Sequence, residues 1–285
     1  MSSIYLSKKI FITILLVLLL PVTVLAAQTT DKKLPEEKQI QVKKNLEIPD
    51  PEAPVTLINL IEVTGKDIDK FVVDWNNESK IMGQKPGFIS AALYRSLLDD
   101  AKYQIINISQ WQSYDAWKAA NKDSGKQFTE SLYRPTAWST NTYEKSFQTE
   151  KQTVNDKREP LQRVQKDPEI KFPESPFVFI NLMEMNAEDV SPFVLDWRVR
   201  SKVMGQMPAA IGSTLYRTVL PDNRFQIVNV SQWQSYNGFV DANNDPDYAE
   251  ELNTDLGHTP SIKLTRGFYR TVGSYTHIYT DIPKQ

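Results

Sequence analysis

The sequence predicts an α+β fold made of two tandem ferredoxin-like domains, each with the order strand, helix, strand, strand, helix, strand (βαββαβ). One observation that predicts it is an internal repeat that spans most of the chain. Another is the alternation, within each copy, of short apolar segments bounded by turn residues and segments with helical periodicity. The strand segments are apolar on both faces, so we expect helices on one side of each sheet and the other copy on the second. The two domains would then form an intramolecular pseudo-dimer.

The repeat is defined by a constant spacing between matching segments. Asp74-Trp75 recurs as Asp196-Trp197, at an offset of 197 − 75 = 122 residues. The same offset relates Asn107–Tyr114 to Asn229–Tyr236, and the match runs without a gap from Val55 to Asn121. Two copies of this length are too long and too few for a solenoid, and they suit two whole domains joined by a linker.

The elements of the first copy follow from periodicity, capping residues and turn residues. They are, in order, a strand at 55–63, a helix opened by Asp67 and ended by Gly83, strands at 88–97 and 103–111, a helix capped by Ser113, and a last strand at 137–147. The last strand of the second copy is expected at 264–275. Side chains four residues apart in a strand share a face, so Asn107 and Trp111 should point the same way, together with Tyr103 and Ile105.

The first 26 residues have the composition of a secretory signal. Lys8 and Lys9 precede an apolar run from Ile10 to Leu20, and small residues lead to a cleavage site after Ala26. The run is shorter than the roughly 20 residues that a spanning helix needs. We therefore expect an exported protein, periplasmic or secreted, with no stable membrane insertion after cleavage. An uncleaved membrane anchor remains the alternative.

The rest of the chain divides by composition. Residues 27–52 are rich in Lys, Glu, Gln and Pro and predict a flexible tether. Residues 53–147 and 174–285 are the two domains, and the polar residues 148–173 are the linker between them. Because the linker makes pairing of the two domains intramolecular, it raises their effective concentration. A further homo-oligomer is left open.

Charge and composition exclude several classes of function. The chain has 33 basic and 35 acidic residues, so no broad basic field is available to attract nucleic acid. It has no cysteine, which excludes disulfides, thiolate metal ligands and cysteine nucleophiles. Its two histidines both lie in the second half, so a paired histidine metal site cannot occur in each copy. We expect no metal site.

The first copy contains a characteristic set of segments: Asn59, the turn Gln84–Phe88, Leu93-Tyr94-Arg95, and Asn107–Trp111 running into Ser113. In these segments the chain resembles the antibiotic biosynthesis monooxygenase family of dimeric α+β barrels. The second copy repeats them with one departure, because Met207-Pro208-Ala209-Ala210 replaces the Pro-Gly-Phe turn. Whether one, both or neither pocket works is left open, and a second pocket reshaped and made degenerate by this departure is one of the alternatives. The resemblance implies an intramolecular dimeric α+β barrel.

The resemblance also implies a set of site residues. An asparagine–asparagine–tryptophan set is implicated in family members that oxygenate anthrones without metal or flavin. The matching positions here are Asn59, Asn107 and Trp111, repeated as Asn181, Asn229 and Trp233. If the first strand turns its asparagine toward the helices, each set lines a cavity between sheet and helices. The expected substrate-binding positions are Tyr94, Trp117, Tyr216 and Phe239.

Two departures limit what the resemblance implies. A tyrosine implicated in some members falls at Trp117 and Phe239, neither of which has a hydroxyl group. A relative that degrades haem uses a histidine ligand on the second helix, whereas the positions here around Asn121 and Asn243 offer none. Haem chemistry through such a ligand is therefore not expected, and no cofactor is expected.

The sequence thus favours a cofactor-independent monooxygenase that uses O2 to oxidise a small aromatic or quinone-related substrate. Such a substrate supplies its own electrons once it has lost a proton. Two alternatives remain: a non-catalytic domain that binds a planar ligand or acts at the cell envelope, and a purely structural unit. The same asparagines and tryptophans also suit a packed core, in which the amides satisfy backbone groups. Asp74 and Asp196 are expected at the surface, where Lys80 and Lys202 are candidate partners.

Overall fold

The computed structural model of the protein describes residues 48–63, 65–122, 132–140, 170, 172–220, 222–246, 248 and 261–277. All of them lie in one unit of the chain, Asn45–Gln285. The predicted signal (1–26), most of the predicted tether (27–52) and most of the predicted linker (148–173) lie outside the described residues. None of the described helices is long and apolar enough to cross a membrane.

The described elements fall into two sets with the same order. The first half contains β1 (Val55–Ile61), α1 (Ile68–Met82), β2 (Phe88–Ser96), β3 (Ile105–Trp111), α2 (Tyr114–Ala120) and β4 (Leu132–Thr140). The second half contains β5 (Phe177–Glu184), α4 (Ala187–Met204), β6 (Ala210–Thr218), β7 (Ile227–Trp233), α5 (Tyr236–Asn243) and β8 (Lys263–Thr276). This is the predicted βαββαβ order in each copy.

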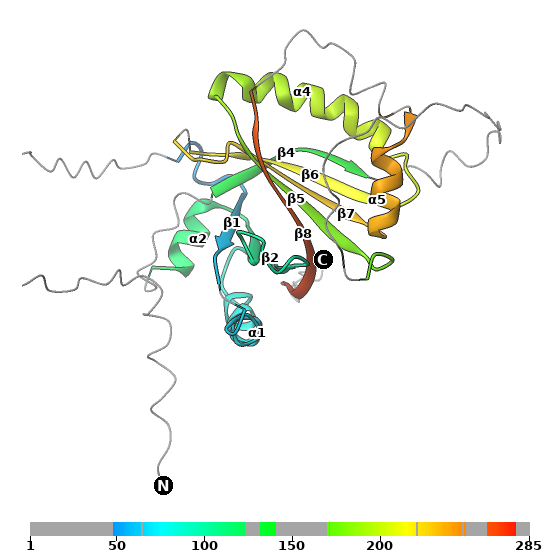
Figure 1. The fold of residues 1–285 in the computed structure, drawn as a ribbon. Helices are drawn as coiled ribbons and strands as arrows, with labels where there is room; N and C mark the ends of the chain where they lie inside the picture. The colour runs from blue at the N-terminus through cyan, green and yellow to red at the C-terminus, as the bar shows by residue number, and fades with distance from the viewer. Residues whose placement is uncertain are drawn as a thin grey trace, which may run out of the picture. The chain divides into compact units, whose positions relative to one another are not determined.

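The strands form one closed barrel with the order β1-β3-β2-β8-β5-β7-β6-β4. The last strand of each half joins the two halves. β8 pairs with β5 through Lys263–Tyr269 and with β2 of the first half through Tyr269–Thr276. β4 pairs with β1 through Leu132 and Tyr133 and with β6 of the second half along most of its length. The predicted α+β fold and intramolecular barrel are therefore confirmed (Figure 1).

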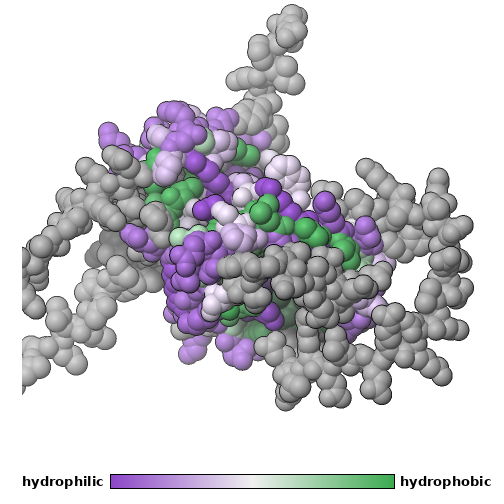
Figure 2. Space-filling view, turned by 90° about the horizontal axis from the view of Figure 1, so that it is seen from above, coloured by the Kyte–Doolittle hydropathy of each residue, from purple (hydrophilic) through white to green (hydrophobic). Residues whose placement is uncertain are grey.

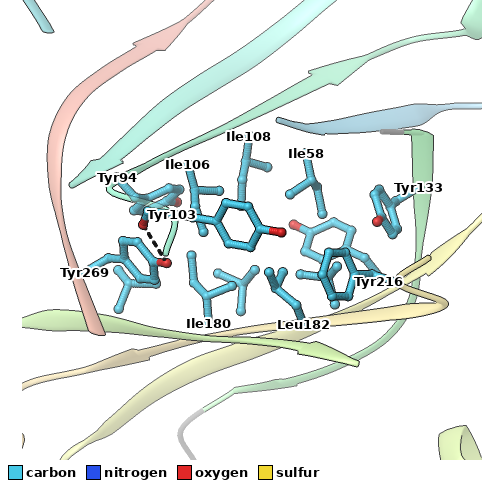
Figure 3. Close-up of a cluster of buried hydrophobic side chains, with 14 residues drawn as sticks. Ile58, Tyr94, Tyr103, Ile106, Ile108, Tyr133, Ile180, Leu182, Tyr216 and Tyr269 are labelled. Atoms are coloured by element: carbon cyan, nitrogen blue, oxygen red, sulfur yellow. Dashed lines mark hydrogen bonds between the residues drawn. The ribbon is translucent and has the colours of Figure 1, made fainter. Parts of the chain in front are cut away.

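Strand alternation separates two layers of side chains. Even-numbered residues of β1, β3, β5 and β7 enter the barrel interior, as do Tyr94 of β2 and Tyr216 of β6. Figure 3 shows this interior, in which five tyrosines lie among isoleucine and leucine side chains. Odd-numbered residues of the same four strands face outward, toward the helices. α1 packs on β8 and α4 packs on β4, so each longer helix covers the last strand of the other half.

The caps of the short helices form as the sequence predicts. The hydroxyl of Ser113 accepts a hydrogen bond from the backbone N–H of Ala116, and that of Ser235 accepts one from Gly238. α1 begins directly after Asp67 and ends at Gly83, although Asp67 makes no side-chain capping bond.

Two predicted boundaries differ from the structure. β4 begins at Leu132 rather than at Ala137, because the ladder with β6 shifts register between Pro135 and Ala137 and so accommodates a proline, which has no N–H to donate. The predicted continuation of this strand to 147 lies outside the described residues. The end of the predicted tether is packed: Ile48 is buried among apolar residues, and Arg134 donates to the carbonyl oxygens of Pro49 and Asp50.

The surface is largely hydrophilic, with separate hydrophobic patches on the face that Figure 2 shows. The large apolar residues that are exposed among the described ones are Val73, Ile81, Trp138, Phe172, Leu195, Val199, Ile211 and Leu264. Single exposed apolar side chains are normal in soluble proteins, so most of these require no special explanation.

Candidate functional site

A cavity of about 380 Å³ lies in the second half, between the outer face of the sheet and the helices α4 and α5. Its floor comes from β5, β6 and β7, and its walls come from the two helices and from the edges of β4 and β8. The residues that line it include Ser139, Phe179, Asn181, Asp196, Trp197, Arg200, Ala210, Ser213, Asn229, Trp233 and Phe239. The volume is within the usual range for small-molecule sites, roughly 300–1,000 Å³.

Two amides lie side by side on the floor of this cavity. Asn181 of β5 is directly opposite Asn229 of β7 in the antiparallel ladder. The Oδ1 atom of Asn181 is buried and has no hydrogen-bond partner. The Oδ1 atom of Asn229 accepts a hydrogen bond of 2.7 Å from the hydroxyl of Ser213 on β6. A buried acceptor without a partner costs about 1–3 kcal/mol, so a ligand hydroxyl or N–H that reached Asn181 would be favoured.

Aromatic rings form a wall beside the amides. Trp233 is 3% exposed, and its indole N–H donates to Ser231 at 3.0 Å, which fixes the ring. Phe239 of α5 meets Trp233 edge to face at 5.1 Å between ring centroids, and Phe179 lies 4.8 Å from Phe239. The arrangement offers ring faces and edges to a flat ligand.

One ion pair of α4 also lines the cavity. Asp196 and Arg200 are paired at 2.7 Å, with side chains about one fifth exposed (22% and 23%). The candidate partner Lys202 therefore does not form the ion pair of Asp196. Asp74 likewise pairs with Lys70 and not with the candidate Lys80. Residues four apart share a helix face, whereas residues six apart do not. A carboxylate and a guanidinium therefore lie beside the two amides.

In the first half the corresponding space is packed. Asn59 is opposite Asn107, and the Oδ1 atom of Asn59 is again buried without a partner. Asn107 accepts a hydrogen bond of 3.0 Å from the indole N–H of Trp75 on α1. Trp111 is 2% exposed, and Phe88 meets it edge to face at 5.2 Å. The predicted set of two amides and one indole is present here, but Phe88 fills the space beside the indole.

Two exchanges of side chains explain the difference between the halves. Phe88 corresponds to Ala210, since 210 − 88 = 122, and the smaller side chain leaves room beside Trp233. In the first half, Tyr275 of β8 lies opposite Ala91 and packs 6.0 Å from Phe88. In the second half, Ser139 of β4 occupies the equivalent place, opposite Ser213. A degenerate second pocket was one of the alternatives left open by the altered turn, and the second half holds the open cavity.

The remaining residues predicted for the site lie in different parts of the structure. Phe239 lines the cavity, whereas its counterpart Trp117 is buried beside Tyr114 in the packed first half. Tyr94 and Tyr216 point into the barrel interior, on the opposite face of the sheet from the amides (Figure 3). Tyr103 also enters the interior and does not share a face with Asn107, because β3 begins only at Ile105.

Four polar residues that line the cavity were not predicted as site residues: Ser139, Asp196, Arg200 and Ser213. The signal for Ser213 was a difference between the copies, because its counterpart is Ala91. In the part of the chain that the structure describes, no three His, Cys, Asp or Glu side chains gather as a metal site would require.

The comparison with known families concerns the first half. Residues 54–125 match the model of the antibiotic biosynthesis monooxygenase family, from the residue before β1 to a point beyond α2. Residues 54–125 are an antibiotic biosynthesis monooxygenase domain. The resemblance of the first copy is therefore confirmed. The open cavity belongs to the second half, which lies outside the matched residues and has the same order of elements as this monooxygenase domain.

Three solved structures share the fold of this chain. An anthrone oxidase-like protein has a TM-score of 0.53 and 11% identity, over 82% of this chain and 97% of that one. A candidate monooxygenase from Fusobacterium nucleatum has a TM-score of 0.51 and 9% identity, over 79% of this chain and 94% of that one. A candidate monooxygenase from Lactobacillus acidophilus has a TM-score of 0.50 and 10% identity, over 79% of this chain and 97% of that one. At these identities the likeness shows the fold alone. No curated protein matches the chain.

Proposed function

We propose that the protein is an exported, cofactor-independent monooxygenase that oxidises an aromatic or quinone-related small molecule with O2. The observation that carries the proposal is the cavity of the second half, where the side chains of Asn181 and Asn229 line a space walled by aromatic rings. The domain match and the likeness to an anthrone oxidase-like protein support the reaction class. The basic and apolar N-terminus supports export.

A flat substrate would lie against Trp233 and Phe239, with a hydroxyl or carbonyl oxygen directed at the amide pair. Ser213 holds the oxygen of Asn229, so the amide N–H groups of Asn229 are directed away from Ser213 and can donate to the substrate. Asn181 lies opposite Asn229, and a substrate hydroxyl that reached its oxygen would supply the partner that this buried acceptor lacks. One amide accepts and the other donates, which suits an oxygen atom that loses its proton during the reaction.

The proton of the reacting carbon needs a base stronger than an amide. Asp196 supplies a carboxylate in the cavity wall, oriented by its ion pair with Arg200. Loss of the proton gives an enolate, whose oxygen accepts hydrogen bonds from the amide N–H groups of Asn229. One such donor in a site sheltered from water contributes about 3 kcal/mol to the transition state.

The oxidation balances without a further reductant when the substrate is anthrone-like. The carbanion reduces O2 and forms a carbon–oxygen bond, which gives a peroxide at the ring carbon. Loss of the second proton from that carbon and cleavage of the O–O bond leave a ketone, and the other oxygen atom departs as water. The substrate gives up four electrons, O2 takes four, and anthrone plus O2 becomes anthraquinone plus water.

Oxygen uptake with anthrone as the probe tests the proposal. Asn229→Ala removes the donor to the enolate, so we expect a fall in kcat of about 100-fold. The matched variant Asn107→Ala changes the counterpart in the packed half, and uptake should stay within about twofold of the unmodified protein. Circular dichroism checks that both variants fold.

The two variants separate the possible results. Equal losses in Asn229→Ala and Asn107→Ala would contradict a reaction confined to the second half. Absence of protein-dependent uptake with anthrone and with several phenolic substrates would overturn the enzymatic proposal. If planar compounds still bound under those conditions, the non-catalytic binding function would replace it.

A further inference from the structure

A second cavity, of about 520 Å³, opens at one end of the barrel interior. Strands of both halves contribute to it, so we call it the axial cavity. Its lining includes Tyr94, Gln110 and Trp138 of the first half and Ile211, Tyr216 and Gln232 of the second. It shares only Ser139, Gly212, Ser213 and Gln232 with the candidate site, which lies on the other face of the sheet.

The axial cavity is polar but carries no charge. None of its lining residues is Asp, Glu, Lys, Arg or His. Its polar groups are two amides, Gln110 and Gln232, which are counterparts at the offset of 122, and a set of hydroxyls from serine, threonine and tyrosine. Such groups both donate and accept hydrogen bonds, and they offer nothing to compensate an ion for its lost hydration.

The two tyrosines that line this cavity, Tyr94 and Tyr216, remain neutral. Burial raises the pKa of Tyr94 to about 12, with a smaller contribution from Tyr216. Burial also raises the pKa of Tyr216, against hydrogen bonds from Gln110 and Thr214. Figure 3 shows both tyrosines within the apolar interior of the barrel, and both also line the axial cavity. They therefore present hydroxyl groups, not phenolates, to whatever enters.

Hydrogen bonds hold these groups in place. The hydroxyl of Ser90 donates to the amide oxygen of Gln110 at 3.1 Å. Gln110 of the first half also lies near the hydroxyl of Tyr216 of the second and lowers the pKa of that hydroxyl. The resulting network is prepared before a ligand arrives, which reduces the entropy lost on binding.

The rim of the cavity adds an apolar surface. Trp138 is 74% exposed although it lines the cavity, and the neighbouring Ile211 is 42% exposed. An indole ring is costly to leave in water and normally packs unless it serves as a contact surface. A ring with carbon–hydrogen faces and hydroxyl edges would stack on Trp138 and reach the amides and hydroxyls behind it.

We propose that the axial cavity binds an uncharged, hydroxyl-bearing ring of the sugar class, independently of the candidate oxygenase site. Trp138 provides the stacking surface, and Gln110, Gln232 and the hydroxyls of both halves provide hydrogen bonds. Because no side chain of the lining is cationic or anionic, uronic acids and amino sugars should bind less well than the neutral sugars of the same shape.

Titration with sugars, followed by nuclear magnetic resonance, tests this binding. The probes are methyl β-glucoside and cellobiose, with methyl β-glucuronide and glucosamine as charged controls. The neutral probes should shift the side-chain amide signals of Gln110 and Gln232 and quench the fluorescence of Trp138. Trp138→Ala, at an exposed position, and Gln110→Leu should each raise Kd about tenfold, which is about 1.4 kcal/mol.

A variant of the candidate site serves as the control. Phe239→Ala, in the wall of the candidate site and outside the axial cavity, should leave sugar affinity unchanged. The proposal fails if no neutral probe shifts either amide at saturating concentrations, if Trp138→Ala binds as tightly as the unmodified chain, or if the charged probes bind equally well. Because the readout is binding alone, it is independent of whether the protein oxidises anthrone.

Discussion

Phe88 and Ala210 occupy the same position in the two copies of the repeat, and their difference in size has a direct structural consequence. Phe88 is 1% exposed and fills the space beside Trp111. Ala210 leaves the equivalent space beside Trp233 open to a ligand. The amides behind these residues also differ, because Asn107 accepts from Trp75 whereas Asn229 accepts from Ser213.

Ala210→Phe should close the cavity of the second half by restoring the residue of the first. The added ring would occupy the space that a planar ligand needs, so we expect affinity for 1,8-dihydroxyanthraquinone to fall at least tenfold. Fluorescence of the cavity tryptophans measures the binding. Overpacking costs about 1–3 kcal/mol where no room exists, so thermal stability shows whether the ring has entered the cavity.

The reciprocal substitution Phe88→Ala is the control for that experiment. It removes a buried ring in the first half and should cost about 3–5 kcal/mol of stability. It does not touch the cavity of the second half, so affinity for the anthraquinone should persist at temperatures where the variant is folded. A loss of affinity in Phe88→Ala that equals the loss in Ala210→Phe would place the binding site elsewhere.

At the scale of elements, the turn before β2 and the turn before β6 show a compensated exchange. Gly87 has a φ of 79°, and a Cβ there would meet the Cβ of Ala116 on α2 at 2.4 Å. In the second half Ala209 takes the place of Gly87, and Gly238 takes that of Ala116. A Cβ on Gly238 would meet Ala209 at 2.2 Å, so the methyl group has moved from the helix to the turn.

The sequence repeat predicted the order of elements and which strand positions carry the amides and indoles, because these depend on local periodicity. It did not predict that Tyr275 fills the first half. The last strands lie outside the gapless repeat and match at another offset, 275 − 139 = 136. Each last strand also pairs with the other half, so its side chains act on a site that its own copy does not form.

The positions of the charged and interior residues also could not be predicted from local sequence patterns. Asp196 and Arg200 are four apart on a helix, a spacing that is visible in the sequence, but their position over the cavity depends on how α4 packs on the sheet. Tyr94 and Tyr216 are amphipathic strand residues whose face is fixed only once the barrel closes. Local pattern therefore predicted the floor of the cavity, and tertiary packing decided its walls.

At the scale of the whole molecule, barrel closure places tyrosines from both halves in one apolar interior. Tyr94, Tyr133, Tyr216 and Tyr269 come from strands β2, β4, β6 and β8, respectively. The hydroxyl of Tyr269 donates a hydrogen bond of 3.1 Å to the backbone carbonyl of Tyr103 (Figure 3). Burial raises the pKa of each of these four tyrosines above its ordinary value.

Stability should therefore fall in alkaline solution. A tyrosine with a raised pKa stays neutral in the folded protein while it ionises in the unfolded chain above pH 10, so the folded state loses stability as pH rises. For Tyr94, whose pKa is about 12, the loss between pH 10 and 12 is about 1.4 kcal/mol per pH unit. Urea unfolding at pH 8, 10 and 11 measures it, and Tyr94→Phe should reduce the slope. A free energy of unfolding that stayed constant from pH 8 to 11 would contradict this.

The number of planar ligands that bind to each chain tests most directly whether one half of the barrel holds the site. Isothermal titration of the unmodified protein with 1,8-dihydroxyanthraquinone gives this number. One ligand per chain is expected, because Tyr275 and Phe88 fill the first half while Ser139 and Ala210 leave the second half open. Two ligands per chain, or none, would contradict a single open site.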